Sequence, residues 1–120
     1  MKILVVDDSK AMRMIVLRTL RQAGFGDHTV LEACDGREGL AAVDSASPDL
    51  VLSDWNMPEV NGIEFLRTLR ASGNQVRFGF VTSESTEAMR TTASEAGALF
   101  LIGKPFTADT FTEALGSVLV

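Results

Sequence analysis

Short apolar runs alternate with longer amphipathic segments along this chain, and no other feature constrains its fold as strongly. Each short run is continuously apolar, as expected for a strand that is covered on both faces. The longer segments repeat apolar residues three and four positions apart, which is the period of an α-helix. Strands that alternate with helices predict an α/β fold, a doubly wound parallel sheet with helices on both faces. We predict five strands and five helices in a single domain that covers residues 1–120.

Turn-forming residues mark where several of these elements begin and end. Gly24 closes the first predicted helix, and Gly62 opens the third. We interpret Met12 and Met14 of the first helix as packing residues, because methionine fills irregular gaps in a core. The predicted strands are 3–6, 30–33, 50–54, 78–82 and 99–102. The predicted helices are 9–23, 37–46, a segment from 62 through 69, 84–96 and 107–119.

Polar side chains with useful chemistry follow the predicted strands at the point where each strand ends. Asp7 and Asp8 follow the first strand, and Asp54 ends the third. Thr82 ends the fourth strand, and Lys104 follows the fifth. Because parallel strands bring their carboxyl ends to one edge of a sheet, we expect these five side chains to converge there.

Three carboxylates at one edge repel one another unless protons or a cation neutralise them. Two unit charges about 4 Å apart cost roughly 4 kcal/mol at an effective dielectric constant near 20. Mg²⁺ suits a site built only from oxygen ligands, and the ammonium of Lys104 suits an incoming phosphate oxygen. A carboxylate beside such a metal and lysine can attack phosphorus, because the two cations offset its charge. Each of these residues alone has an ordinary explanation, as a helix cap, a turn residue or a solvated charge, but their joint placement predicts a phosphoryl-transfer site.

At this point the chain resembles the response-regulator receiver domains of two-component signalling, and the CheY-like members most closely. The resemblance covers nearly the whole chain, and its motifs are specific in their order and spacing. They are Leu4-Val5-Val6-Asp7-Asp8-Ser9, Ser53-Asp54-Trp55-Asn56-Met57-Pro58, Asn61-Gly62, Val81-Thr82-Ser83 and Lys104-Pro105-Phe106. The family has the flavodoxin-like fold with strand order 2-1-3-4-5. That order comes from the resemblance and not from the residues.

The resemblance also assigns a metal site. It implies that Asp54 is the phosphorylated residue. Asp8 and Asp54 would bind Mg²⁺ directly, together with the backbone carbonyl of Asn56, while Asp7 would act through bound water. Mg²⁺ is the cofactor that this arrangement implies.

The same resemblance assigns the groups that respond to phosphorylation. Thr82 would hydrogen-bond the phosphoryl group and Lys104 would pair with it. The Lys104–Pro105 peptide is similar to one that is cis in the family. Receivers usually carry Tyr or Phe three residues before that lysine, whereas this chain has Leu101, with Phe100 expected on the opposite side of the strand.

The implied function is signalling rather than enzymatic turnover, because such a domain catalyses only its own phosphorylation and dephosphorylation. A sensor histidine kinase or a phosphotransfer domain would supply the phosphoryl group, and a downstream protein, for example in chemotaxis, would bind the altered face. A phosphorelay carrier or a phosphate sink is an alternative. An aspartyl-phosphate phosphohydrolase of the haloacid-dehalogenase class is another, but its motif needs Asp where Asn56 stands. A flavodoxin-like flavin binder and a pseudo-receiver that never takes phosphate are further alternatives.

Charge and cysteine content bear on partners and location. Lysine and arginine number 11 and the acids 16, so the formal net charge is 11 − 16 = −5. This balance argues against a nucleic-acid or anionic-membrane surface, since both need a positive footprint. The apolar run at the N-terminus stops at two acids, which argues against a signal peptide or a membrane span. With Cys34 as the single cysteine, we expect a reduced, cytoplasmic setting and a structural thiol.

Overall fold

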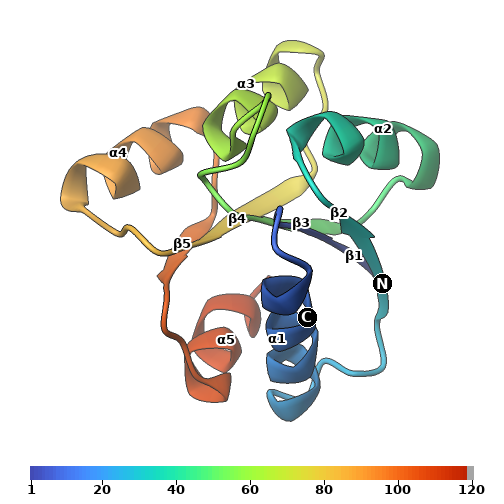
Figure 1. The fold of residues 1–120 in the computed structure, drawn as a ribbon, viewed down its shortest axis with the longest axis vertical. Coiled ribbons are helices and arrows are strands. Elements are labelled where there is room, and N and C mark those ends of the chain that lie inside the picture. The colour runs from blue at the N-terminus through green and yellow to red at the C-terminus, as the bar shows by residue number, and fades with distance from the viewer. Residues whose placement is uncertain (119–120) are drawn as a thin grey trace.

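The computed structural model describes residues 1–118 and consists of a parallel sheet between two layers of helices (Figure 1). Its strands are β1 (Lys2–Val6), β2 (Thr29–Ala33), β3 (Leu50–Ser53), β4 (Arg77–Thr82) and β5 (Phe100–Gly103). Its helices are α1 (Lys10–Gln22), α2 (Gly36–Ala46), α3 (Gly62–Ala71), α4 (Glu87–Ala96) and α5 (Ala108–Leu115). The strand order β2-β1-β3-β4-β5 confirms the doubly wound α/β prediction within the described residues.

The helices begin at residues whose side chains accept a hydrogen bond from the first turn. Ser9 accepts from the N–H of Met12, for example, and Asn61 from that of Glu64. This pattern corrects the predicted start of the fourth helix, because Thr86 is the cap and the helix begins at Glu87 instead of at residue 84. The fifth helix ends at Leu115, which is shorter than the predicted 107–119. Residue 119 of that prediction lies outside the described residues.

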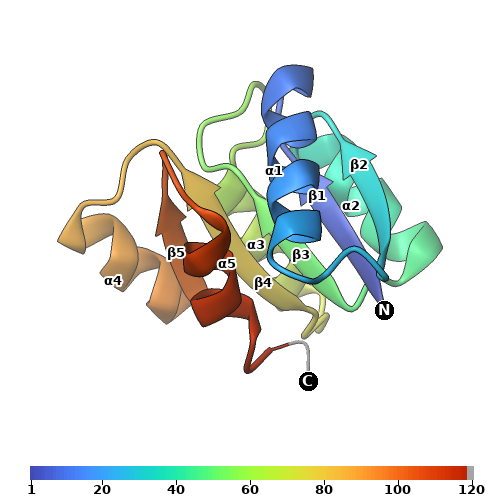
Figure 2. The same cartoon turned by 90° about the horizontal axis from the view of Figure 1, so that it is seen from below.

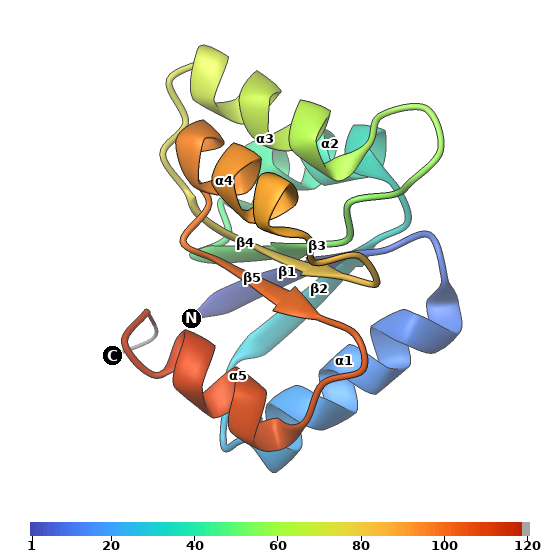
Figure 3. The ribbon, with the colours of Figure 1, turned by 90° about the vertical axis from the view of Figure 1, so that its left-hand side faces the viewer.

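Two apolar layers hold the sheet to its helices, with α2, α3 and α4 on one face and α1 and α5 on the other (Figures 2 and 3). Phe65, Phe78 and Phe80 form edge-to-face aromatic contacts in the first layer. Leu101 packs in that layer and Phe100 against the other, so their side chains lie on opposite faces of β5 as expected. Leu101 and Phe100 therefore cover opposite faces of β5, which is the last strand of the sheet.

Helix α1 departs from the expected packing. Met14 is 56% exposed and Ile15 is 41% exposed, and Met12 is only partly buried. Our interpretation of Met14 as a packing residue was therefore wrong. Val16 and Leu20 bury the helix against the sheet instead, which leaves an apolar strip on its outer side. None of the described helices has the length and hydrophobicity that a membrane span would need.

Candidate functional site

The three predicted carboxylates and the predicted lysine meet at the carboxyl edge of the sheet. Asp7, Asp8 and Asp54 each place a carboxylate oxygen within 4.8 Å of those of the other two. The ammonium of Lys104 lies 3.2 Å from Oδ2 of Asp7 and 3.4 Å from Oδ2 of Asp54. These contacts join residues that are 97 and 50 positions apart in the sequence.

Asp7 is held at every one of its polar atoms. Its N–H donates to the carbonyl of Ala33 at 3.1 Å, and its own carbonyl accepts from Nη1 of Arg13 at 2.6 Å. Its Oδ1 accepts from the N–H of Ser9 at 2.9 Å, and its Oδ2 pairs with Lys104. Since Asp7 is also buried, its carboxylate is preorganised by the protein.

Asp54 is fixed by its backbone and by one carboxylate oxygen. Its N–H donates to the carbonyl of Val6 at 2.9 Å, and its Oδ1 accepts from the N–H of Trp55 at 2.7 Å. Burial raises the pKa of the Asp54 carboxyl above its usual value, and the charge of Asp7 adds to this rise. The positive charge of Lys104 acts in the opposite direction. A further cation beside Asp54 would therefore stabilise the ionised form of its carboxyl.

The residues present fit a magnesium ion. Three carboxylates against one ammonium leave an excess of negative charge, and all available donors are oxygens, which are the ligands that Mg²⁺ prefers. Asp8 is exposed, in contrast to the fully bonded Asp7, so it is free to turn toward a cation. Asn56 is exposed in the loop after β3, and its role as a ligand through the backbone carbonyl stays a prediction.

Thr82 lies at the end of β4 with an unpartnered hydroxyl. The residue is fully buried, and its Oγ1 has no hydrogen-bond partner among the described residues. The backbone N–H of Lys104 donates to the carbonyl of Thr82 at 2.8 Å, so the sheet holds these two residues next to each other. The Lys104–Pro105 peptide bond is cis, as predicted. A buried hydroxyl of this kind has an unused donor, and its bond to a phosphoryl oxygen stays a prediction.

Sequence reasoning missed two groups that support the acids. Arg13 and Ser9 both bond to Asp7, and neither was singled out as a site residue. No local pattern singles out Arg13, because Lys10 is also a basic residue near the start of α1.

A second acidic cluster lies at the start of α2 and is explained by local bonding. Cys34, Asp35 and Glu38 offer ligand atoms within 4.8 Å of one another. Asp35 caps α2 by accepting from the N–H of Glu38, and Glu38 accepts from both the N–H and the thiol of Cys34. The hydrogen bond to Glu38 raises the pKa of the Cys34 thiol, which supports a structural role.

Comparison with known proteins defines the class. Residues 3–116 match the family model of the response regulator receiver domain, so the chain belongs to that family. Within it the chain is similar to the chemotaxis protein CheY1 of Helicobacter pylori strain J99, with 40% identity over 99% of this chain and 97% of the relative. It is 38% identical to the chemotaxis protein CheY-3 of Vibrio cholerae over 98% and 91% of the two chains. It is therefore a CheY-like receiver domain.

Solved structures agree with this assignment. The chemotaxis protein CheY4 of Vibrio cholerae has a TM-score of 0.84 and 34% identity, with 98% of this chain and 97% of that chain covered. A response regulator receiver domain protein from Clostridium thermocellum has a TM-score of 0.84 at 27% identity, over 98% and 93% of the chains. The protein is a phosphoacceptor in signalling and not a classical enzyme, and a receiver domain implies a two-component kinase as partner. This membership speaks against the phosphohydrolase and flavin-binding alternatives.

Proposed function

We propose that Asp54 accepts a phosphoryl group from a histidine kinase or a phosphotransfer domain, and that the whole of residues 1–120 forms the receiver. The observation that carries this proposal is the position of the Lys104 ammonium between Asp7 and Asp54. In the same proposal Asp8, Asp54 and the carbonyl of Asn56 hold Mg²⁺, and Asp7 acts on it through water. A cytoplasmic location goes with this function, because ATP-dependent kinase domains work there.

Each side chain of the site has a role in the phosphoryl transfer. The carboxylate of Asp54 forms the new P–O bond through Oδ2, while the N–H of Trp55 keeps Oδ1 in place. The P–N bond of the donor phosphohistidine breaks, and its electron pair stays on the imidazole. Lys104 then pairs with a phosphoryl oxygen, and the hydroxyl of Thr82 donates to another. Bound Mg²⁺ would supply charge neutralisation at the phosphoryl oxygens.

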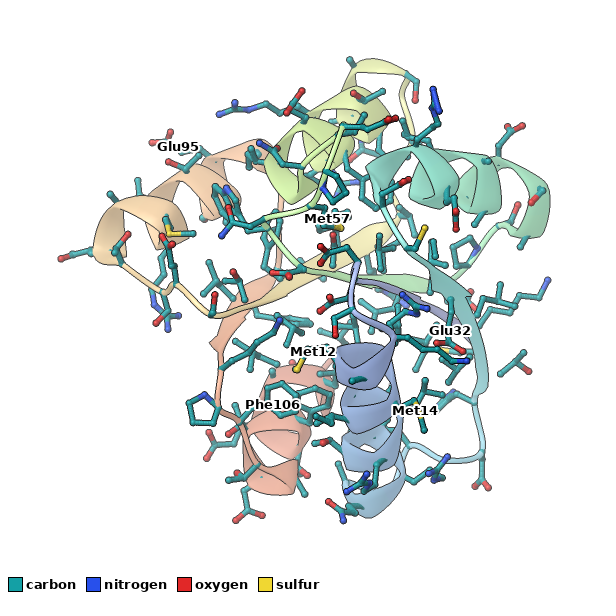
Figure 4. The ribbon with its side chains drawn as sticks, in the orientation of Figure 1. Met12, Met14, Glu32, Met57, Glu95 and Phe106 are labelled. Carbon is teal, nitrogen blue, oxygen red and sulfur yellow. The ribbon has the colours of Figure 1, made fainter. Side chains whose placement is uncertain are left out.

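An apolar groove beside Lys104 supports an approach of the donor over α1. Met12, Ile15, Pro105 and Phe106 line it with Lys104, and it has a volume of about 340 Å³. Figure 4 shows Met12 on α1 near Phe106, which lies in the segment between β5 and α5. Helix α1 carries four basic residues and no acid, so a helical phosphotransfer domain with acidic and apolar side chains would complement it.

We propose chemotaxis as the output, since the similar relatives carry that name. A phosphorelay carrier or phosphate sink is the second candidate. Leu101 favours it, because an aliphatic side chain at the usual aromatic position gives a smaller change of surface than a turning ring.

Labelling with acetyl phosphate tests the acceptor. Intact-mass measurement should detect one added phosphoryl group on the wild type in the presence of Mg²⁺, and none on Asp54→Asn. Asp44→Asn is the matched control, because Asp44 is exposed and remote from the strand ends in sequence. Equal labelling of wild type and Asp54→Asn would reject Asp54. Phosphotransfer profiling against the histidine kinases and phosphotransfer domains of the source organism then separates a chemotaxis output from a phosphorelay.

A further inference from the structure

Arg13 joins three elements around the acidic site. Its Nη1 donates to the backbone carbonyl of Asp7 at 2.6 Å, and its Nε donates to Oε1 of Glu32 at 2.9 Å. The first contact reaches the turn after β1, and the second reaches the edge strand β2. Figure 4 shows Glu32 beside the first turns of α1. The side chain of Arg13 is only 13% exposed, against 45% for that of Glu32.

Helix stability does not explain this arginine. Arg13 is the fourth residue of α1, where the positive end of the helix dipole weakly opposes a cation, and the first turn contains no acid to offset it. Burying a guanidinium also costs free energy unless it is paired and hydrogen-bonded. Both costs are met here by tertiary contacts, from Glu32 and from the carbonyl of Asp7.

The contact to the Asp7 carbonyl has a direct consequence for Asp8. The peptide group is planar, so the carbonyl of Asp7, the N–H of Asp8 and the Cα of Asp8 lie in one plane. A donor that fixes the direction of that carbonyl also fixes the plane from which the Asp8 side chain departs. Asp8 itself is exposed, so its backbone is held only through its neighbours: by the Arg13 contact, by the bond from the Asp7 N–H to Ala33 and by the bond from the Ser9 N–H to Asp7.

We propose that Arg13, held by Glu32, is a positioning residue for the cation site. It orients the Asp7–Asp8 peptide so that the Asp8 carboxylate is presented to Mg²⁺ together with that of Asp54. This role rests on the proposed function, since it assumes that the site binds Mg²⁺. Groups that orient metal ligands change affinity by about 10- to 100-fold when they are removed.

A positioning effect of Arg13 and an effect of its charge change the Mg²⁺ affinity in opposite directions. A guanidinium near three carboxylates repels Mg²⁺, so removing it should raise the affinity if charge alone matters. If Arg13 acts by position, Arg13→Met should lower the affinity, by about tenfold. Arg13→Lys keeps the charge but cannot hold both contacts with one planar fork, so positioning predicts weaker binding for it as well.

Mg²⁺ titration followed by Trp55 fluorescence measures these affinities. Arg13→Met and Arg13→Lys should bind Mg²⁺ more weakly than wild type, and Glu32→Gln should show a smaller loss in the same direction. Arg18→Met is the matched control, because Arg18 is exposed on the same helix, and its affinity should equal that of wild type or rise slightly. An affinity that is unchanged or raised in both Arg13 variants overturns the proposal.

A measurement without metal distinguishes this proposal from the proposed function. In the metal-free protein, the amide hydrogen of Ser9, which donates to Oδ1 of Asp7, should exchange faster in Arg13→Lys and Glu32→Gln than in wild type, while exchange in the strands stays the same. Thermal unfolding of each variant checks that it folds. If Arg13→Met does not fold, Glu32→Gln still tests the proposal. Failure of wild type to bind Mg²⁺ would reject the proposed metal site, whereas unchanged amide exchange would reject the positioning role.

Discussion

Replacing Thr82 with valine should stabilise the metal-free protein and at the same time disable its switch. The Oγ1 of Thr82 is buried without a partner in the described structure, and an unsatisfied buried polar group costs about 1–3 kcal/mol. Valine has nearly the same shape and suits the end of a strand. Thr82→Val should therefore raise the free energy of unfolding by about 1–3 kcal/mol, or roughly 3–5 °C in melting temperature for each kcal/mol in a domain of this size.

The phosphorylated state should respond in the opposite direction. There the hydroxyl would donate to a phosphoryl oxygen, a charge-assisted hydrogen bond that is worth about 1.5–3 kcal/mol. Its loss shifts the equilibrium between inactive and active states by roughly ten- to over a hundredfold. Thr82→Val should thus still accept phosphate on Asp54 but show little rearrangement of the loop between β4 and α4.

Urea unfolding tests the predicted gain in stability, and NMR with and without beryllofluoride, a phosphoryl mimic, tests the predicted loss of switching. Thr19→Val is the matched control, because Thr19 is also buried but its hydroxyl donates to the carbonyl of Ile15 at 2.8 Å. That variant should be neutral or less stable than wild type. If Thr82→Val loses stability as Thr19→Val does, or switches fully with beryllofluoride, the reasoning about the Thr82 hydroxyl is wrong.

Three further predictions concern the acids, the thiol and the sheet. Asp8→Asn should weaken Mg²⁺ binding strongly yet raise the melting temperature of the metal-free protein, because it removes one of three clustered charges; an unchanged affinity in fluorescence titration would contradict its role as a ligand. Glu38→Gln should speed alkylation of Cys34 at mildly alkaline pH, since the hydrogen bond to Glu38 raises the thiol pKa and the thiolate is the reactive form; equal rates by mass spectrometry would argue against this. Gly79→Ala should destabilise the fold in urea, because its Cβ would overlap the ring of Phe100, and Phe100→Leu in the same chain should restore part of the loss.

Several features could be predicted because they follow from local spacing. The strand and helix periods identified all ten described elements to within a few residues, and N-cap residues such as Ser9 and Asn61 explain most starts. The largest errors were the start of α4 and the end of α5. We predicted that α4 begins at residue 84, but Thr86 caps it and leaves the preceding residues in the loop.

The outer face of α1 could not be predicted from its pattern. Ile15 belongs to the apolar stripe of this helix and Met14 adjoins it, yet both are exposed. Periodicity identifies an apolar stripe but does not say how wide a strip the sheet covers. Only the packing of α1 beside α5 decides that Val16 and Leu20 face inward, whereas Met14 and Ile15 face outward.

By itself, the sequence determined the α/β class, the order of the elements and the set of residues at the strand ends, because strand and helix periods are local and parallel strands carry their carboxyl ends to one edge. The tertiary structure alone decided which of those residues touch. Lys104 reaches Asp7 across 97 positions, and Arg13 reaches Glu32 across 19, by contacts that no local pattern encodes. It also decided that Asp7 is fully bonded while Asp8 is exposed, since burial depends on what the folded chain places over each side chain.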